Sequence, residues 1–82
     1  MFYLYVLQSE KTGKFYIGSS GDLDDRLHRH NSGYSKSTKF GCPWKLVYTE
    51  SFPTRGEAMK RESEIKRWKS HKRIAEMVSV SR

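Results

Sequence analysis

The sequence has 82 residues, one cysteine and a formal net charge of +7. This length allows one small domain and excludes two, so we expect a single domain over residues 1–82. The lone Cys42 excludes an intramolecular disulfide and a cysteine-based zinc site, and an aromatic content of 13% argues against a disordered chain.

Residues 2–7 place aromatic and branched side chains on both alternating faces, which predicts a strand covered on both sides. The run is too short for a signal peptide or a membrane span, so we expect a cytoplasmic protein without a membrane partner. Residues 10–13 are typical of a turn, and residues 14–19 predict a second strand that completes a β-hairpin.

Asp22 is expected to open a helix that reaches about Asn31 and stops at Gly33. Residues 34–41 are polar and basic, which favours a loop. Residues 44–49 predict a third strand.

Residues 54–57 match the capping-box pattern, and the helix that they begin is expected to continue through Trp68. Ser70 is the expected N-cap of a last short helix. The order strand, strand, helix, strand, helix, helix predicts an α+β domain with a three-stranded antiparallel sheet.

Glu62 is the most informative residue of the second long helix. If Ala58 is set to zero, Glu62 falls at about 40° and Ile65 at about −20°, so the carboxylate shares the apolar stripe. A carboxylate that faces a core is costly unless it is paired or binds a cation. A salt bridge to Arg26, an exposed Glu62 and a Mg²⁺ site all remain open, because Mg²⁺ is often held by one carboxylate with substrate oxygens and water.

Arg26 and His30 give a companion signal on the first helix. His30 shares the inner stripe with Leu23 and Leu27, and Arg26 lies on its flank, so the two polar side chains can act at one place. An arginine there can grip a phosphate with two donors. An ordinary solvated arginine and a core histidine are the plainer interpretation of each residue alone.

Three tyrosines belong to the predicted hairpin: Tyr3, Tyr5 and Tyr16. Tyr16 shares its strand face with Gly18, and a glycine there leaves space for something to approach. Core packing is the commonest use of such a tyrosine. A catalytic role requires surroundings that let the phenol lose its proton.

The sequence as a whole resembles the GIY-YIG endonuclease superfamily, most of all its small standalone bacterial members and the nuclease half of a structure-specific resolving enzyme. The tripeptide Tyr16-Ile17-Gly18 alone is weak evidence, but an arginine ten residues after that tyrosine and a late helix glutamate make the pattern specific. The segments that carry the resemblance are residues 5–9, 15–19, 22–33, 43–48 and 52–62.

This resemblance implies a site for metal-dependent hydrolysis of phosphodiester bonds in DNA. Tyr16 resembles the general base, Tyr5 the first-motif tyrosine, and Arg26 the arginine on the scissile phosphate. His30 resembles a second proton or phosphate contact, and Glu62 the single carboxylate that binds Mg²⁺ or Mn²⁺.

The sequence departs from the family pattern at two places. The first motif lacks its glycine, so Tyr3 stays open as a substitute for Tyr5. Some relatives have a lysine soon after the second motif, where this chain has Ser19 and Ser20.

Residues 60–73 contain seven Lys/Arg and two acids, so they form either a basic surface that binds the phosphate backbone or an ordinary solvated helix face. No segment is typical of a base-reading helix, so we expect a nuclease that is selective for structure or strand rather than for sequence. A role in DNA repair or processing is a further expectation, and RNA and a protein partner that supplies target choice stay open. The expected nucleic-acid contacts are Arg26, Tyr34, Lys36, Lys39, Lys66 and Lys69.

Two other classes of function compete with the nuclease. A catalytically weak or inactive nucleic-acid-binding module would keep the basic surface and use Tyr5, Tyr16 and Glu62 only for structure. A protein adaptor would dock through Trp44 and Trp68 and would show no salt-sensitive DNA affinity.

Overall fold

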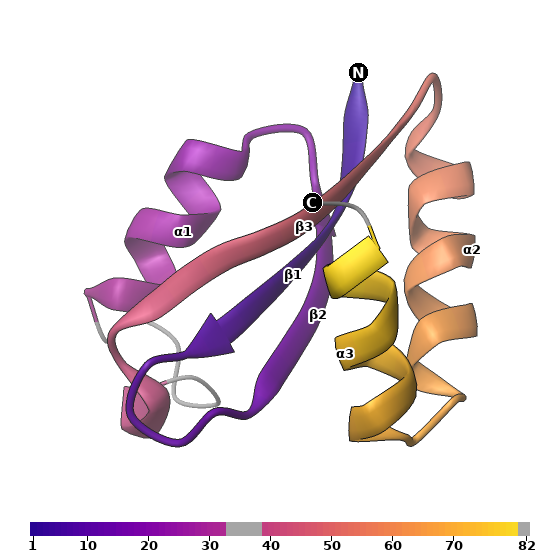
Figure 1. Cartoon of the computed structure of the whole chain (residues 1–82). Helices are drawn as coiled ribbons and strands as arrows, with labels where there is room; N and C mark the ends of the chain where they lie inside the picture. The colour runs from indigo at the N-terminus through magenta and orange to yellow at the C-terminus, as the bar shows by residue number, and fades with distance from the viewer. Residues whose placement is uncertain (33–38, 81–82) are drawn as a thin grey trace.

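Three antiparallel strands form one sheet in the order β2-β1-β3, in a computed structural model that describes residues 1–32 and 39–80. Helix α1 covers one face of the sheet, and α2 and α3 cover the other (Figure 1). The predicted α+β class, three-stranded sheet and element order are confirmed. The elements are β1 (Phe2–Ser9), β2 (Phe15–Ser20), α1 (Leu23–Asn31), the 3₁₀ turn η1 (Lys39–Gly41), β3 (Trp44–Phe52), α2 (Arg55–Lys66) and α3 (His71–Val80).

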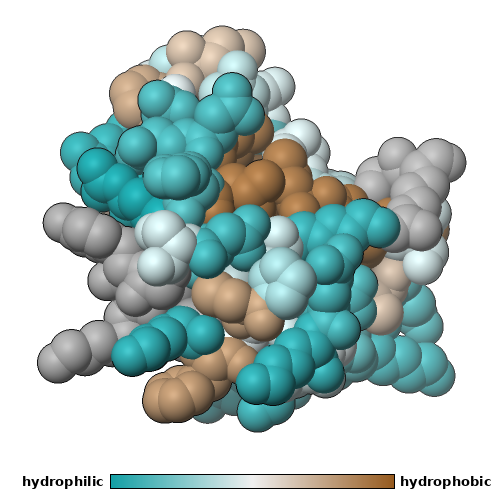
Figure 2. All heavy atoms as spheres, turned by 90° about the vertical axis from the view of Figure 1, so that its left-hand side faces the viewer, coloured by the Kyte–Doolittle hydropathy of each residue, from teal (hydrophilic) through white to brown (hydrophobic). Residues whose placement is uncertain are grey.

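Central strand β1 divides the hydrophobic core into two clusters, because its side chains alternate between the two faces. The α1 side holds Tyr5, Leu7 and Trp44. Figure 2, which looks onto this side, shows a mostly hydrophilic surface broken by an apolar band. The larger cluster, under α2 and α3, contains Leu4, Val6, Ile17, Ile65, Ile74 and Val78.

All three predicted helix starts are confirmed by side-chain caps. Asp22 accepts a hydrogen bond from the backbone N–H of Asp25, at 3.0 Å. Thr54 accepts one from the N–H of Glu57 at 3.3 Å, and Ser70 accepts one at 3.2 Å at the start of α3. Within the described residues, no helix is long and apolar enough to span a bilayer.

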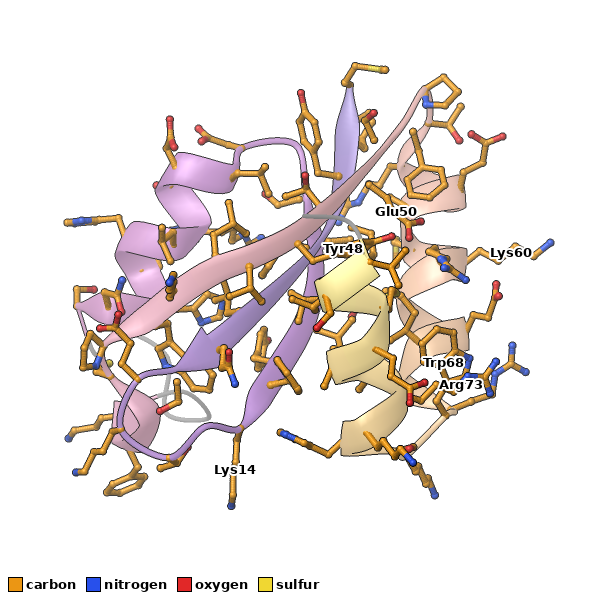
Figure 3. The ribbon with its side chains drawn as sticks, in the orientation of Figure 1. Lys14, Tyr48, Glu50, Lys60, Trp68 and Arg73 are labelled. Carbon is orange, nitrogen blue, oxygen red and sulfur yellow. The ribbon has the colours of Figure 1, made fainter. Side chains whose placement is uncertain are left out.

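The expectation that α2 continues through Trp68 is wrong, because the helix ends at Lys66. Trp68 lies in the turn between α2 and α3, where the Arg73 guanidinium stacks 4.1 Å from its ring centroid (Figure 3). Strand β3 is longer than predicted and reaches Phe52, because Phe2 at the start of β1 pairs with it.

Arg61 fixes the rotation of α2 relative to the sheet. Its Nε donates to Glu50 Oε1 of β3 at 3.0 Å, and a terminal nitrogen donates to Glu64 at 2.8 Å. Tyr48 also donates to Glu50, and these two side chains lie together on β3 beside α2 (Figure 3). The hydrogen bond to Glu50 is the main reason why the pKa of Arg61 is raised, so the guanidinium stays charged in this contact.

Replacement of Ile65 should show how far the fold depends on the α2 side of the core. Ile65 is fully buried, so Ile65→Ala should lower the free energy of unfolding by about 2–5 kcal/mol. Met59→Ala is the matched control, because Met59 lies on the same helix with 49% of its surface exposed and should change stability by less than about 1 kcal/mol. Urea unfolding of both variants measures the difference; equal losses would contradict this account of the core.

Candidate active site

Tyr5 lies across strand β2 at Gly18, its partner in the β1–β2 ladder. A Cβ atom at Gly18 would lie 2.4 Å from the Tyr5 hydroxyl oxygen and 2.5 Å from Cζ, so the Tyr5 ring would have to move to admit any side chain there. The space that we expected beside Gly18 is therefore occupied by the phenol of Tyr5. The absence of a side chain at Gly18 therefore makes room for the protein's own Tyr5 ring, on the face of the sheet that α1 covers.

The rings of Tyr5, Tyr16 and His30 form one cluster at this point, in which Tyr5 and His30 are buried and Tyr16 is half-buried. The Tyr5 hydroxyl and His30 Nε2 are 3.2 Å apart and share a hydrogen bond. The Tyr16 and His30 ring centroids lie 4.6 Å apart, and those of the two tyrosines 6.5 Å apart. His30 is only 4% exposed, so its predicted inward orientation is confirmed.

Asn31 anchors the end of α1 that carries His30. Its side chain donates from Nδ2 to the carbonyl oxygen of Trp44 at 3.1 Å and accepts from the N–H of the same residue. The Sγ of Cys42 donates to the His30 carbonyl oxygen at 3.0 Å. The start of β3 thereby fixes the last turn of α1, and with it the imidazole.

Burial keeps both hydrogen-bonded rings neutral. It raises the pKa of Tyr5 to about 12, with a smaller contribution from the neighbouring Tyr16. Burial also lowers the pKa of His30, and the positive charge of Arg26 adds to that effect. At neutral pH the Tyr5 phenol therefore keeps its proton, and the imidazole is uncharged.

Arg26 connects this cluster to a surface cavity of about 250 Å³. Its charge lowers the pKa of Tyr5 as well as that of His30, so the guanidinium acts electrostatically on both rings. Among the described residues, Arg26 has no carboxylate partner. Ser19, Ser20 and Arg55 line the same cavity, together with apolar residues such as Phe2 and Met59. Two arginines and two serines therefore border one space that is large enough to admit a phosphate group.

Glu62 reaches the edge of β2 from the opposite face of the sheet. Ser19 donates to Glu62 Oε1 at 2.6 Å, and Lys66 Nζ lies 2.6 Å from Oε2. The Glu62 side chain is 22% exposed, and its partner is Lys66 rather than Arg26, so the salt bridge considered from the sequence is wrong in its partner. The negative charge of Glu62 is one of the causes that raise the pKa of Tyr5, which places the carboxylate within electrostatic reach of the phenol.

The five residues expected to be catalytic therefore gather around one stretch of β2, although only Arg26 lines the cavity itself. The first-motif tyrosine that contacts His30 is Tyr5. Of the expected nucleic-acid contacts, Lys39 and Lys69 are exposed, Lys66 pairs with Glu62, and Tyr34 and Lys36 lie outside the described residues. Sequence reasoning missed Ser19, Asn31 and Arg55, whose contacts join segments far apart in the chain.

A divalent cation fits the donors at Glu62. Within residues 1–32 and 39–80, no three or more His, Cys, Asp or Glu side chains are grouped to hold a metal ion. Mg²⁺ does not require such a cage, since it keeps several waters and uses one or two carboxylates together with substrate phosphate. Glu62 supplies one such carboxylate, and its partner Ser19 lines the cavity, which can admit a substrate phosphate.

Comparison with known proteins agrees with this fold. The family model of the GIY-YIG catalytic domain matches residues 1–75. The chain therefore belongs to the GIY-YIG family, whose catalytic domain is a nuclease that hydrolyses phosphodiester bonds, which implies a nucleic-acid substrate.

Within this family the chain is similar to small UPF0213 proteins. One from Staphylococcus saprophyticus is 41% identical over 73 residues, which cover 88% of each chain. One from Streptococcus pneumoniae is 43% identical over 68 residues, which cover 82% of this chain and 68% of that protein. The solution NMR structure of UPF0213 protein BH0048 from Bacillus halodurans is 36% identical, has a TM-score of 0.59, and covers 98% of this chain and 85% of its own.

Gly18→Ala should push the Tyr5 ring away from His30. Because Tyr5 is buried, the added methyl group should lower the free energy of unfolding by about 1–3 kcal/mol. Gly56→Ala is the control: a Cβ there meets nothing within 4 Å, and alanine in a helix should stabilise the protein by up to about 1 kcal/mol. Denaturant unfolding checks both signs, and a stable Gly18→Ala variant would contradict the close approach.

His30 should make the fold sensitive to acid. Its pKa is lower in the folded state than in the unfolded chain, so the unfolded state binds the proton first as the pH falls. The free energy of unfolding should be fully retained above the unfolded pKa of about 6.5 and fall progressively below it.

The measurement is the pH dependence of stability between pH 8 and pH 5. His30→Gln should flatten it, whereas His28→Gln, at an exposed position of the same helix, should leave it unchanged. An NMR titration of His30 near or above its ordinary pKa would overturn the argument.

Proposed function

We propose that this protein is an endonuclease that hydrolyses phosphodiester bonds in DNA, with a divalent cation held by Glu62. The observation that carries the proposal is the gathering of two phenols, an imidazole, a guanidinium and a carboxylate at one edge of β2. Each of these groups has a use in phosphoryl transfer, and the chain belongs to a nuclease family.

The two phenols divide the proton chemistry between them. With a pKa of about 12, Tyr5 keeps its proton and serves as a hydrogen-bond donor. Tyr16, which is less buried and lies against the His30 ring, is the group that we assign as general base for the attacking water. The neutral imidazole of His30 orients Tyr5 and can exchange a proton at Nε2.

Arg26 binds the scissile phosphate and offsets the charge that grows on it in the transition state. Its guanidinium lines the cavity, and Arg55 faces the same space from the first turn of α2. We assign Arg55 to a phosphate oxygen of the same or the neighbouring nucleotide. Two guanidinium groups give the site a preference for polyanionic chains.

Nucleases of this family generally depend on a divalent metal, and we assign Mg²⁺ or Mn²⁺ to Glu62. When bound, such a cation supplies Lewis-acid stabilisation of the phosphate and its leaving oxygen. Glu62 would hold it next to Ser19, which lines the same cavity as Arg26.

The preferred substrate is DNA of a particular structure or strandedness, processed during DNA repair in the cytoplasm. The structural selectivity is supported by the absence, within the described residues, of a helix arranged to read bases. Exposed lysines such as Lys39 and Lys69 are placed to contact the nucleic-acid backbone, which carries no sequence information. Tyr34 and Lys36 are further proposed contacts. RNA is the alternative substrate, and a protein partner is one source of target choice.

Glu62→Gln tests the enzymatic assignment directly. Cleavage of plasmid, single-stranded and branched DNA with Mg²⁺ should fall by about 100-fold or more, because the variant loses the charge that binds the cation. Glu64→Gln is the matched control on the same helix, since Glu64 is 48% exposed and pairs only with Arg61 among the described residues. Circular dichroism confirms that both variants are folded.

The same panel separates the competing functions. Equal cleavage by wild type and Glu62→Gln would overturn the assignment of Glu62. A wild-type protein that cuts none of the substrates but binds them with steep salt dependence would be a nucleic-acid-binding module.

A further inference from the structure

We infer that Ser19 is a positioning residue for Glu62, and that the Lys66 ammonium holds the place of the divalent cation until the cation displaces it. This inference rests on the proposed function, in which Glu62 is the metal ligand. It assigns a separate partner to each oxygen of that carboxylate.

Ser19 holds Oε1 from a strand that is already fixed by its neighbours. The 2.6 Å hydrogen bond joins residues 43 positions apart, and Ser19 follows Gly18 directly in β2. Since successive strand residues point to opposite faces, Gly18 carries the Tyr5 phenol on one face and Ser19 carries the Glu62 carboxylate on the other. Ser19 thereby removes rotamer freedom from Glu62 and sets its distance from the phenols.

Lys66 holds Oε2 in a way that is easily reversed. The 2.6 Å ion pair spans one helical turn, and the Lys66 side chain is 52% exposed while that of Glu62 is 22% exposed. An exposed pair of this spacing is weak and is screened by salt, so a divalent cation can replace the ammonium. The hydroxyl of Ser19 stays on the other oxygen during this exchange.

The exchange changes the role of Lys66. Before metal binding, its charge balances the half-buried carboxylate, which would otherwise be costly. After the exchange, the flexible lysine stem can carry the ammonium into solvent, where a phosphate of the substrate is its available partner. One lysine would thus act first as a substitute cation and then as a backbone contact.

Mn²⁺ binding measured without substrate tests the inference by a readout other than cleavage. Isothermal titration and the electron paramagnetic resonance signal of free Mn²⁺ give the dissociation constant. Lys66→Met should bind Mn²⁺ about 3–10-fold more tightly than wild type, because the competing ammonium is removed.

Lys60→Met is the matched control for a general charge effect. Lys60 lies on the same helix, points away from the sheet and forms no ion pair among the described residues (Figure 3). Its replacement should change the affinity less than twofold. If Lys66→Met and Lys60→Met bind equally, Lys66 is not a placeholder.

Ser19→Ala should weaken Mn²⁺ binding about 10-fold, at the lower end of the range of about 10–100-fold for residues that orient a metal ligand, and Ser19→Thr should restore it because it keeps the hydroxyl. An unchanged affinity in Ser19→Ala would overturn the positioning role. Glu62→Gln distinguishes a failure of the metal assignment from a failure of the roles given to Ser19 and Lys66. If this variant binds Mn²⁺ as wild type does, Glu62 is not the metal ligand. If Glu62→Gln loses binding while Lys66→Met and Ser19→Ala do not differ from wild type, only the present inference fails.

Discussion

The register of β1 against β2 is the constraint on which the candidate site depends. It pairs Tyr5 with Gly18 and Leu7 with Tyr16, which sets both phenols on the face that α1 covers. If the register of β2 against β1 shifted by one residue, every side chain of β2 would move to the opposite face of the sheet. Ser19 would then point toward α1 and could not meet the carboxylate of Glu62, and Tyr5 would meet a side chain where it now crosses a bare backbone.

The phenols and the carboxylate lie on opposite faces of the sheet, and they come within electrostatic reach of one another at the outer strand β2. Tyr5, Tyr16 and His30 lie on the α1 side, whereas Ser19 receives Glu62 on the α2 side. This meeting is possible only because β2 is an outer strand in the order β2-β1-β3. A free strand edge is usually a liability. Here it leaves room for a cavity that Arg26 lines from the α1 side and that Ser19 and Arg55 line from the α2 side.

The sequence was sufficient for the elements and for the inward faces of the helices. Helical spacing placed His30 and Glu62 toward the sheet, and capping residues marked the helix starts, because both signals are local. Contacts between distant segments left no such signal. Neither the hydrogen bond from Ser19 to Glu62 nor the position of Arg55 on the cavity can be obtained from spacing alone.

Gly18 illustrates the same limit from the other side. A glycine in a strand indicates a close approach, but the pattern does not say whether a ligand or the protein itself approaches. The occupant is Tyr5, whose ring reaches this point only because the hairpin register places it opposite the glycine. A glycine that makes room for a ligand and a glycine that makes room for a packed side chain give the same sequence pattern.

Helix α2 couples the two edges of the sheet through consecutive residues. Arg61 is fixed to Glu50 on β3, and Glu62, turned by about 100° around the helix axis, reaches Ser19 on β2. The two outer strands are about 10 Å apart in a three-stranded sheet. A helix with its side chains is about 10–12 Å wide, so side chains on two flanks of α2 can reach both outer strands. The carboxylate can stay in place only if the helix does not rotate, and the Arg61–Glu50 contact resists that rotation. The ion pair on β3 therefore serves the candidate active site without touching it, and the geometry around Glu62 depends on both edges of the sheet at once.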